Sequence, residues 1–371
     1  MSIATYASAD FGQMANLISD SAAVKQKLDL LTTQVSTGLV ANTYAGLDAS
    51  AAVPLNLQPQ IAALQTWQNN ISQASSRMQV TQTAMTQLQQ IASNFLAQTS
   101  NLEGADASEV DSVAAAAQQA LVQVAGLLNT QDGNTYVFAG QDTGNPPVPE
   151  SDSILSSGFY TQIAAQVGQL GVQGAAVTVG NTLTIAGSNA AGLSPFSVYL
   201  SQPMQSAANP LSTLQAPTIQ IGQGQTASVG LLASSNSASI SSTGVPASST
   251  GSYMRDLMLS LATIGSLRSS QVGDVGYTTL VQSINATLTG AISAMAEDAG
   301  VLGNTQANLT TSQTTMADTA TALTTQVGDV QNVDMAAALS NLSLMQTQLQ
   351  ASYQVIAAMS GLSLVKFLPA G

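Results

Sequence analysis

Apolar residues recur at alternating spacings of three and four near the start of the chain, which is the pattern of a helix with one buried face. From about Ala9 to Val35 the pattern follows a heptad, in which Ser21 takes one apolar position. Its apolar members are Met14, Leu17, Val24, Leu28, Leu31 and Val35. Such a heptad predicts a coiled-coil seam, and Gly38 is placed to end the helix.

Two further helices are predicted before the middle of the chain. The longest unbroken pattern of three and four runs from about Gln60 to Leu102. After Gly104, Ser108 is the expected N-cap of the next helix, because its hydroxyl can accept from a free backbone N–H of the first turn. The seam of this third helix is Val110, Val113, Ala117, Ala120, Val124 and Leu127.

The periodicity changes after Asp132-Gly133, a dipeptide typical of turns. Tyr136-Val-Phe indicates a short strand, and Pro146-Pro147 excludes a helix at that point. Three short alternating runs follow, and they predict strands: Ala176-Val-Thr-Val, Thr182-Leu-Thr-Ile and Thr218-Ile-Gln-Ile. The segment 146–250 is therefore expected to be a β-rich insert.

Helical periodicity resumes at Tyr253 and continues in a longer helix from about Tyr277. A last helix is predicted near the end of the chain, and Leu364 and Phe367 lie beyond its regular part. The seam of this last helix is Met335, Leu339, Leu342, Met345, Leu349, Tyr353 and Ile356.

The order helices, insert, helices predicts a mainly α fold with a β-rich insert. Both chain ends would lie side by side in a long antiparallel coiled-coil rod, from which the β domain projects. We expect three domains: terminal helices (1–45 and 328–371), a helical rod (46–145 and 251–327) and an outer insert (146–250).

Charge and composition exclude several functions. The chain has 19 acidic and six basic residues among 371, a net charge of −13, and the bases form no stripe that could neutralise phosphates. It has no cysteine and no histidine, so the usual nucleophilic thiol, neutral-pH base and transition-metal ligand are missing. Val113–Leu128, the most apolar helical stretch, is interrupted by glutamines and is too short to span a membrane. We expect no enzyme activity, no cofactor or metal, no nucleic acid and no membrane insertion.

Two motifs that could suggest chemistry have simpler interpretations. The acidic residues Glu103, Asp106, Glu109 and Asp111 lie near a predicted helix start, where carboxylates favour the positive end of the helix dipole. Gly222-Gln-Gly224 lacks the lysine of a phosphate loop and the third glycine of a dinucleotide fingerprint, so a turn at a strand edge is the better interpretation.

The terminal seams require a partner surface. A pair of helices alone is marginal in water, and side chains such as Leu28, Leu342 and Phe367 would remain partly exposed in it. We therefore predict that the seam residues of both terminal helices, together with Leu364 and Phe367, form an assembly interface that is buried between subunits. The low content of ionised groups suits this role, because burying them between subunits is costly.

Segments at both ends resemble the bacterial flagellin superfamily. At the N-terminal end these are Leu31-Thr-Thr-Gln-Val-Ser-Thr-Gly38-Leu and the extended stretch to Asp48, and at the C-terminal end Asp334 to Tyr353 and Ser363-Leu-Val-Lys-Phe-Leu. The resemblance implies terminal helices that form an inner assembly domain, a helical second domain and an outward-facing insert. It covers most of the chain outside the insert.

Two details favour the hook-filament junction branch of this superfamily. Asn134-Thr-Tyr-Val-Phe-Ala-Gly140-Gln-Asp-Thr resembles the segment with which junction proteins enter their outer domain, and the tail from Ser363 resembles theirs. The charged run that follows the first helix in many flagellins is missing after Gly38. Pro369-Ala-Gly371 extends past the usual end of the family pattern.

The resemblance implies an extracellular protein of the flagellum that is exported without a cleaved signal peptide. Its implied partners are copies of itself in a ring, the first hook-associated protein, flagellin, and a cytoplasmic export chaperone. Two alternatives stay open, a flagellin filament subunit and a secreted coiled-coil adhesin or translocator. A glycosidase would need a pair of carboxylates in a pocket of the insert.

Overall fold

The structure is a computed structural model that describes residues 3–104, 106–202, 214–236 and 248–365, with side chains described between residues 14 and 359 of these ranges. The elements divide into two compact units. Unit 1 comprises Met1–Gln65 and Ala317–Gly371, and unit 2 comprises Thr66–Met316. The described chain is mainly helical with short strands, which confirms the predicted fold class. The three domain boundaries expected from the sequence stay a prediction.

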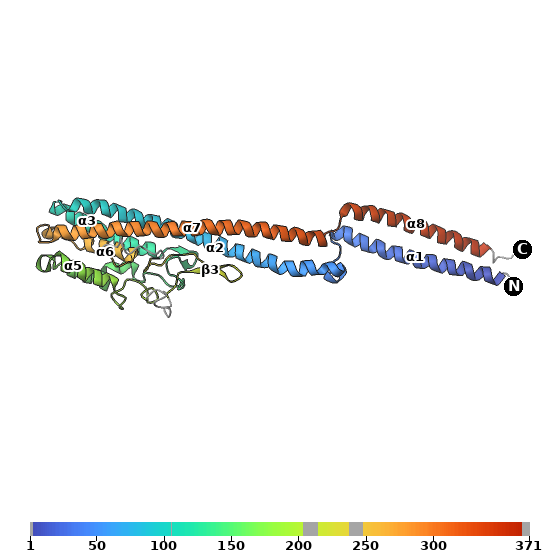
Figure 1. Cartoon of the computed structure of the whole chain (residues 1–371), viewed down its shortest axis with the longest axis horizontal. Helices are drawn as coiled ribbons and strands as arrows, with labels where there is room; N and C mark the ends of the chain where they lie inside the picture. The colour runs from blue at the N-terminus through green and yellow to red at the C-terminus, as the bar shows by residue number, and fades with distance from the viewer. Residues whose placement is uncertain (1–2, 105, 203–213, 237–247, 366–371) are drawn as a thin grey trace. The chain divides into compact units, whose positions relative to one another are not determined.

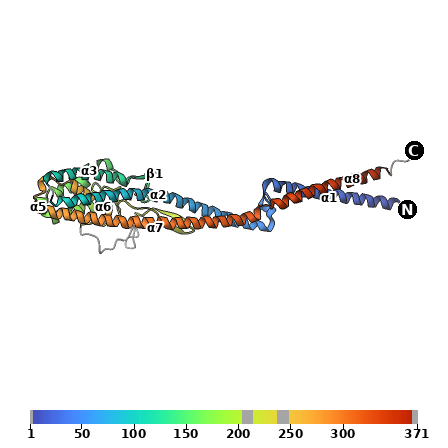
Figure 2. The same ribbon diagram turned by 90° about the horizontal axis from the view of Figure 1, so that it is seen from above.

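In unit 1, helices α1 (Ile3–Thr37) and α8 (Met335–Val365) lie side by side in both views (Figures 1 and 2). Gly38 ends α1 in a left-handed conformation with φ of +74°, as the sequence predicted. The side chain of Asp334 caps α8, because its Oδ1 accepts from the backbone N–H groups of Ala336 and Ala337 at 2.9 and 3.1 Å.

A small backbone bridge in unit 1 joins the end of α1 to the start of α8. The N–H of Val40 donates to the carbonyl of Gln331 at 2.8 Å, and the N–H of Val333 donates to the carbonyl of Gly38 at 2.9 Å. Gln34 adds a side-chain bond to the carbonyl of Val40 at 2.8 Å. Because α1 ends and α8 begins at this bridge, the bridge fixes which residues of the two helices face each other.

Two long helices run through both units, α2 (Ala52–Leu102) and α7 (Tyr277–Gln331), and the short helix η1 (Tyr44–Ala51) precedes α2 in unit 1. Unit 2 adds further helices and two antiparallel hairpins. In chain order these are α3 (Ala107–Leu128), β1 (Gln131–Asp132), β2 (Thr135–Tyr136), η2 (Ser151–Ser156), α4 (Gly158–Val167), α5 (Leu170–Gly187), β3 (Thr218–Gly222), β4 (Gln225–Ser228), α6 (Tyr253–Gly265) and η3 (Ser269–Gln271).

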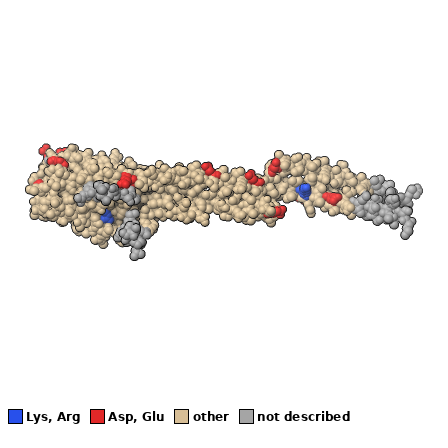
Figure 3. Space-filling model, in the orientation of Figure 1, with Lys and Arg blue, Asp and Glu red and all other residues tan. Residues whose placement is uncertain are grey.

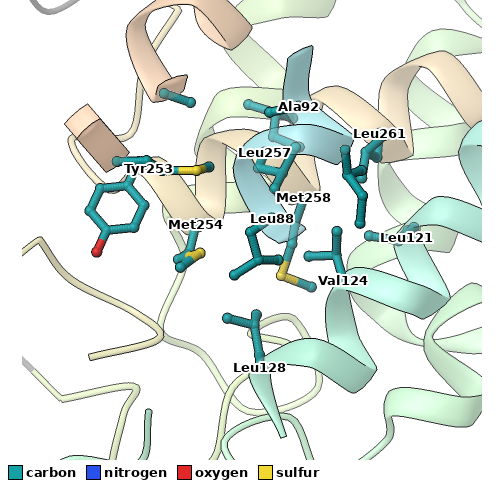
Figure 4. Packing of buried hydrophobic residues seen from close by; sticks show 14 of the residues in the cluster. Leu88, Ala92, Leu121, Val124, Leu128, Tyr253, Met254, Leu257, Met258 and Leu261 are labelled. Carbon is teal, nitrogen blue, oxygen red and sulfur yellow. The ribbon is translucent and has the colours of Figure 1, made fainter. Parts of the chain in front are cut away.

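The core of unit 2 surrounds α6, of which every residue is buried. Leu88 and Ala92 of α2 and Leu121 and Val124 of α3 point toward α6 in the close view (Figure 4). The residues that α6 contributes there are Tyr253, Met254, Leu257, Met258 and Leu261. The strong apolar period of α2 is thus satisfied inside unit 2, where burial of such side chains is the main stabilising term.

Two of the predicted strands are wrong. Residues 176–179 and 182–185 belong to α5, which is kinked at Gly174, and after the kink its buried positions are Ala175, Thr178, Thr182 and Ala186. Their spacings of three and four are those of a helix, and the small side chains let α5 approach α6 closely. The alternation of Thr with Val, Leu and Ile in these two runs has the period of a strand, although the residues are helical. The strand at Thr218 is confirmed, and it pairs with β4.

Three local predictions can be compared with the structure. The turn at Gly222-Gln-Gly224 is confirmed, because it joins β3 to β4 and Gly224 has a φ of +72°. Asp132-Gly133 lies at the β1–β2 hairpin, also as predicted. The N-cap prediction at Ser108 is wrong: Asp106 precedes the first turn of α3, and Ser108 lies inside the helix.

Candidate assembly interface

The predicted seam of α1 faces α8. Leu31 is buried, and the other seam residues of α1 with described side chains are half-buried: Met14, Leu17, Val24, Leu28 and Val35. Ser21, the polar member of the heptad, is buried and satisfies its hydroxyl by donating to the carbonyl of Leu17 at 2.8 Å. The heptad therefore packs within the chain along its full described length.

The predicted seam of α8 is divided between two faces. Leu342, Met345, Leu349 and Ile356 are half-buried and follow buried Ala338 at spacings of three and four. Met335, Leu339 and Tyr353 are exposed, by 41%, 50% and 53%. The side chains of Leu364 and Phe367 lie outside the described residues.

Further exposed apolar residues lie away from the contact between α1 and α8. Sequence analysis did not select them because it collected only the positions of the seams. They are Ile18 and Leu30 on α1, and Leu344 and Val355 on α8. We call these four, together with Met335, Leu339 and Tyr353, the outer face of unit 1. Large apolar side chains that stay exposed on two adjacent helices make this face a candidate interaction site.

Charge provides the signal that could have identified the outer face. Helix α8 contains no Asp, Glu, Lys or Arg from Met335 to Val365. The charged residues of α1 with described side chains are Asp20, Lys25, Lys27 and Asp29, all exposed. On the face shown in Figure 3, charged side chains are few and scattered over an uncharged surface. A helix that is apolar or neutral on all sides is normally a buried helix.

The two helices can therefore contribute to assembly in two ways. The seam between α1 and α8 forms the pair, and the outer face remains available to another chain. Amide and hydroxyl groups between the apolar residues, such as Gln346 and Thr347, can pair across an interface without the cost of burying a charge. No helix in the described part of the chain is long and apolar enough to cross a bilayer.

Buried ionisable groups in unit 2 are the alternative candidate for a functional site. The guanidinium of Arg255 donates to the carbonyls of Ser234, Ala186 and Ser188 and to Oδ1 of Asn189. Burial lowers its pKa to about 10, although the charge of Asp256 acts in the opposite direction. These bonds hold the end of α5 against α6, so Arg255 serves the fold.

Asp256 and Tyr253, two further buried ionisable groups of α6, also form hydrogen bonds within the fold. Asp256 accepts from the hydroxyl of Ser249 and from the N–H and hydroxyl of Thr250, yet burial raises its pKa. Tyr253 donates to Oδ2 of Asp298 at 2.7 Å, and burial together with that carboxylate raises the pKa of Tyr253 well above its usual value.

The acidic cluster near α3 has a structural role at one of its members. Oδ1 of Asp111 accepts the backbone N–H of Ser269 at 2.8 Å, and the side-chain and backbone hydrogen bonds from Ser269 lower the pKa of Asp111. The bond ties α3 to the start of η3. Among the described residues, no three such acids gather in a way that could hold a metal ion.

A cleft of about 540 Å³ lies in unit 2 between α2, the β1–β2 hairpin and β3. Its charged lining residues are Arg77 and Asp132, and the rest are amide, hydroxyl and apolar side chains. A glycosidase uses two carboxylates on opposite sides of the scissile bond, and this lining offers one. The surface with the clearest functional character is therefore the outer face of unit 1.

Paired terminal helices with exposed apolar side chains are the features of unit 1 with which known protein families can be compared. Two family models match the chain: the bacterial flagellin N-terminal helical region at residues 12–143, and the bacterial flagellin C-terminal helical region at residues 286–368. Together they cover more than half of the 371 residues, and the chain belongs to the bacterial flagellin superfamily. No curated protein matches it.

Membership of this family makes the chain a structural subunit of the bacterial flagellum. Proteins of the family are exported to the flagellum, outside the cell, and self-assemble into flagellar polymers. The family points to a non-enzymatic role. The matched regions include α2, α3, α8 and most of α1 and α7, so they contain the outer face of unit 1.

Proposed function

We propose that the chain is the hook-filament junction subunit, which forms a ring between the first hook-associated protein and the flagellin filament. The observation that carries this proposal is the segment Asn134–Thr143, whose sequence resembles the entry into the outer domain of junction proteins. The tail from Ser363 to Leu368 gives independent support, because it resembles theirs better than the arginine-ended tail common in flagellins.

The entry segment has a defined structural task, which explains why its residues matter. Val137, Phe138 and Ala139 are buried, and the carbonyl of Phe138 accepts the N–H of Ala233 at 3.0 Å. Gly140 follows with a φ of +67°. The segment therefore anchors the point where the chain leaves β2 and enters the insert.

Assembly of the proposed ring uses the outer face of unit 1. Copies of the chain would bury Leu344, Tyr353 and the other apolar residues of this face against each other. The hook-associated protein would contact one side of the ring and flagellin the other. Before export, a cytoplasmic chaperone that covers α8 would keep the same residues from associating. The mechanism is mechanical adaptation between hook and filament, with no chemical step.

The test is deletion of the gene, followed by electron microscopy of the hooks and by measurement of flagellin in cells and medium. Bare hooks together with monomeric flagellin shed into the medium are the expected result. Loss of the flagellin band itself would instead identify the chain as the filament subunit. Intact filaments would contradict both flagellar roles, provided that the strain lacks all paralogues, and would favour the adhesin or translocator.

A complementation experiment connects this test to the structure. The deletion strain should regain filaments when it expresses the unchanged chain, and also when it expresses a chain with Ser340→Asp, which adds the same charge one turn from Leu344 but removes no apolar side chain. It should stay without filaments when it expresses Leu344→Asp. Equal rescue by the two variants would show that the outer face takes no part in the role.

A further inference from the structure

A small, partly open pocket lies in unit 2 where α5, α6 and α7 meet, and its chemistry goes beyond the assembly role. Its volume is about 20 Å³, enough for one water molecule and too small for other ligands. The wall is formed by Val179, Thr182, Ser248, Leu259, Ser260, Thr263, Leu280, Ser283, Ile284 and Thr287. Six of these ten side chains carry a hydroxyl, so the cavity is polar, unlike the apolar cavities that stay dry.

Ser260 of α6 is the residue that the rest of the protein leaves unsatisfied. Its side chain is 1% exposed, and its Oγ has no hydrogen-bond partner among the described residues. Buried hydroxyl groups in native proteins nearly always have a partner, either in the protein or in ordered water. Because Ser260 lines the cavity, a molecule in the cavity is the available partner.

The neighbouring hydroxyls of Thr182 and Thr263 differ from that of Ser260, because each already donates its proton to a backbone carbonyl. Oγ1 of Thr182 donates to the carbonyl of Val179 at 3.1 Å, and Oγ1 of Thr263 donates to the carbonyl of Leu259 at 2.8 Å. A hydroxyl that donates its proton still has lone pairs that can accept. Thr182 and Thr263 therefore offer acceptors to the cavity, while Ser260 offers a donor.

Two further hydroxyls of the wall, those of Ser248 and Thr287, satisfy each other. Ser248 and Thr287 are joined through their oxygens at 2.6 Å, and Thr287 also donates to the carbonyl of Ser283 at 2.9 Å. This pair links the segment before α6 to α7 without help from the cavity. Among the hydroxyls of α5 and α6 that line the cavity, Ser260 is thus the one without a partner in the described part of the chain.

We propose that one structural water molecule occupies this cavity, where it accepts from Ser260 and donates to Thr182 and Thr263. Three hydrogen bonds are the usual number for a buried water. The water joins α5 to α6 at a contact built from small and polar side chains instead of large apolar ones. It explains how a serine is accommodated in the middle of a fully buried helix.

The test compares Ser260→Ala with the unchanged full-length chain by the midpoint of thermal unfolding. If the water is bound, the alanine removes one of its three partners, and the midpoint should fall by roughly 2–4 °C. If the cavity is dry, the same change removes an unsatisfied buried hydroxyl, and the midpoint should rise. A rise, or no change, would overturn the proposal.

A matched control and a direct readout complete the test. Ser266→Ala alters the same helix, but the hydroxyl of Ser266 donates to the carbonyl of Ala262 at 2.6 Å and does not line the cavity. The proposal expects a smaller fall for this control than for Ser260→Ala. A crystal structure of the unchanged chain should show electron density within hydrogen-bond distance of Ser260 Oγ, and an empty cavity there would refute the proposal whatever the midpoints.

Discussion

Gly140 shows how a single residue sets the path of the chain into the insert. Its φ of +67° is strained for any residue with a side chain, and a Cβ would lie 2.7 Å from Cδ2 of Leu232 and 2.9 Å from the carbonyl oxygen of Gln215. Backbone strain and steric overlap add, so Gly140→Ala should lower the free energy of unfolding of unit 2 by about 2–4 kcal/mol. Urea unfolding followed by circular dichroism measures this loss.

Gly133 supplies the control, because it shares the positive φ, at +60°, but has no atoms within 4 Å of the position of a Cβ. Gly133→Ala should therefore cost only the strain, about 1–2 kcal/mol. Equal losses in the two variants would show that the contacts with Leu232 and Gln215 relax, and that overlap is not what requires glycine at position 140.

Asp256 should make the stability of unit 2 depend on pH. Burial raises the pKa of this carboxyl in the folded state, so folding disfavours its charge. The stabilising contribution is then fully present below the unfolded pKa of 3.8 and is lost as pH rises through the higher folded value. Arg255, with a pKa of about 10, stays charged throughout this range.

The prediction is tested by subtracting the unfolding free energy of Asp256→Asn from that of the unchanged chain at several pH values. The difference should become more favourable to the unchanged chain as pH falls from 7 toward 3, because only the aspartate can gain a proton. A difference that becomes less favourable in acid would mean that the bonds from Ser249 and Thr250 outweigh burial.

At the scale of elements, α8 pairs with α1 through its seam residues, and the proposed assembly uses its other residues. Leu344 is 60% exposed on the outer face, so Leu344→Asp should leave the pair of α1 and α8 intact and prevent incorporation into polymers. Pelleting of assembled protein and electron microscopy measure incorporation, and circular dichroism of the monomer checks that helix content is unchanged. Ser340→Asp, exposed but already polar, should assemble nearly as well as the unchanged chain.

The seam of α8 gives a different expected result. Leu349 is half-buried in the seam, so Leu349→Asp places a charge in the contact with α1 and should separate the pair as well as block assembly. The corresponding change on the other helix is Leu28→Asp. In both variants α6 and its neighbours in unit 2 should stay folded, as judged by protease resistance. Normal incorporation of either variant would contradict an assembly role for the terminal helices.

The elements also show what the sequence could and could not predict. The seams of α1 and α2 were found because large apolar residues repeat without interruption, and Gly38 marked the end of α1. Helix α5 was missed because its buried face consists of Ala and Thr, whose burial carries little hydrophobic signal. Part of the outer face was missed because a search for one stripe ignores residues such as Leu344 on the other side of the helix.

For the molecule as a whole, the two units differ in how completely their packed side chains are buried. Unit 2 has a continuous core with fully buried side chains from α2, α3, α6 and α7. In unit 1 the contact between α1 and α8 contains mostly half-buried residues, and Leu31 and Ala338 are its buried apolar members among the described side chains. A chain that assembles through unit 1 can thus keep unit 2 stably folded before its terminal helices bind a partner.

This difference predicts unequal hydrogen exchange in the free monomer. Amides of α1 and α8 should exchange at least about 100-fold faster than those of α6, because a pair of half-buried helices opens at a much lower free energy than a closed core. Exchange in α1 and α8 should slow markedly once the chain is assembled, while exchange in α6 should not change. Mass spectrometry of monomer and polymer measures both. If α1 and α8 are already as protected as α6 in the monomer, their order does not depend on assembly, and the apolar outer face would have to be explained by a partner that binds a preformed pair.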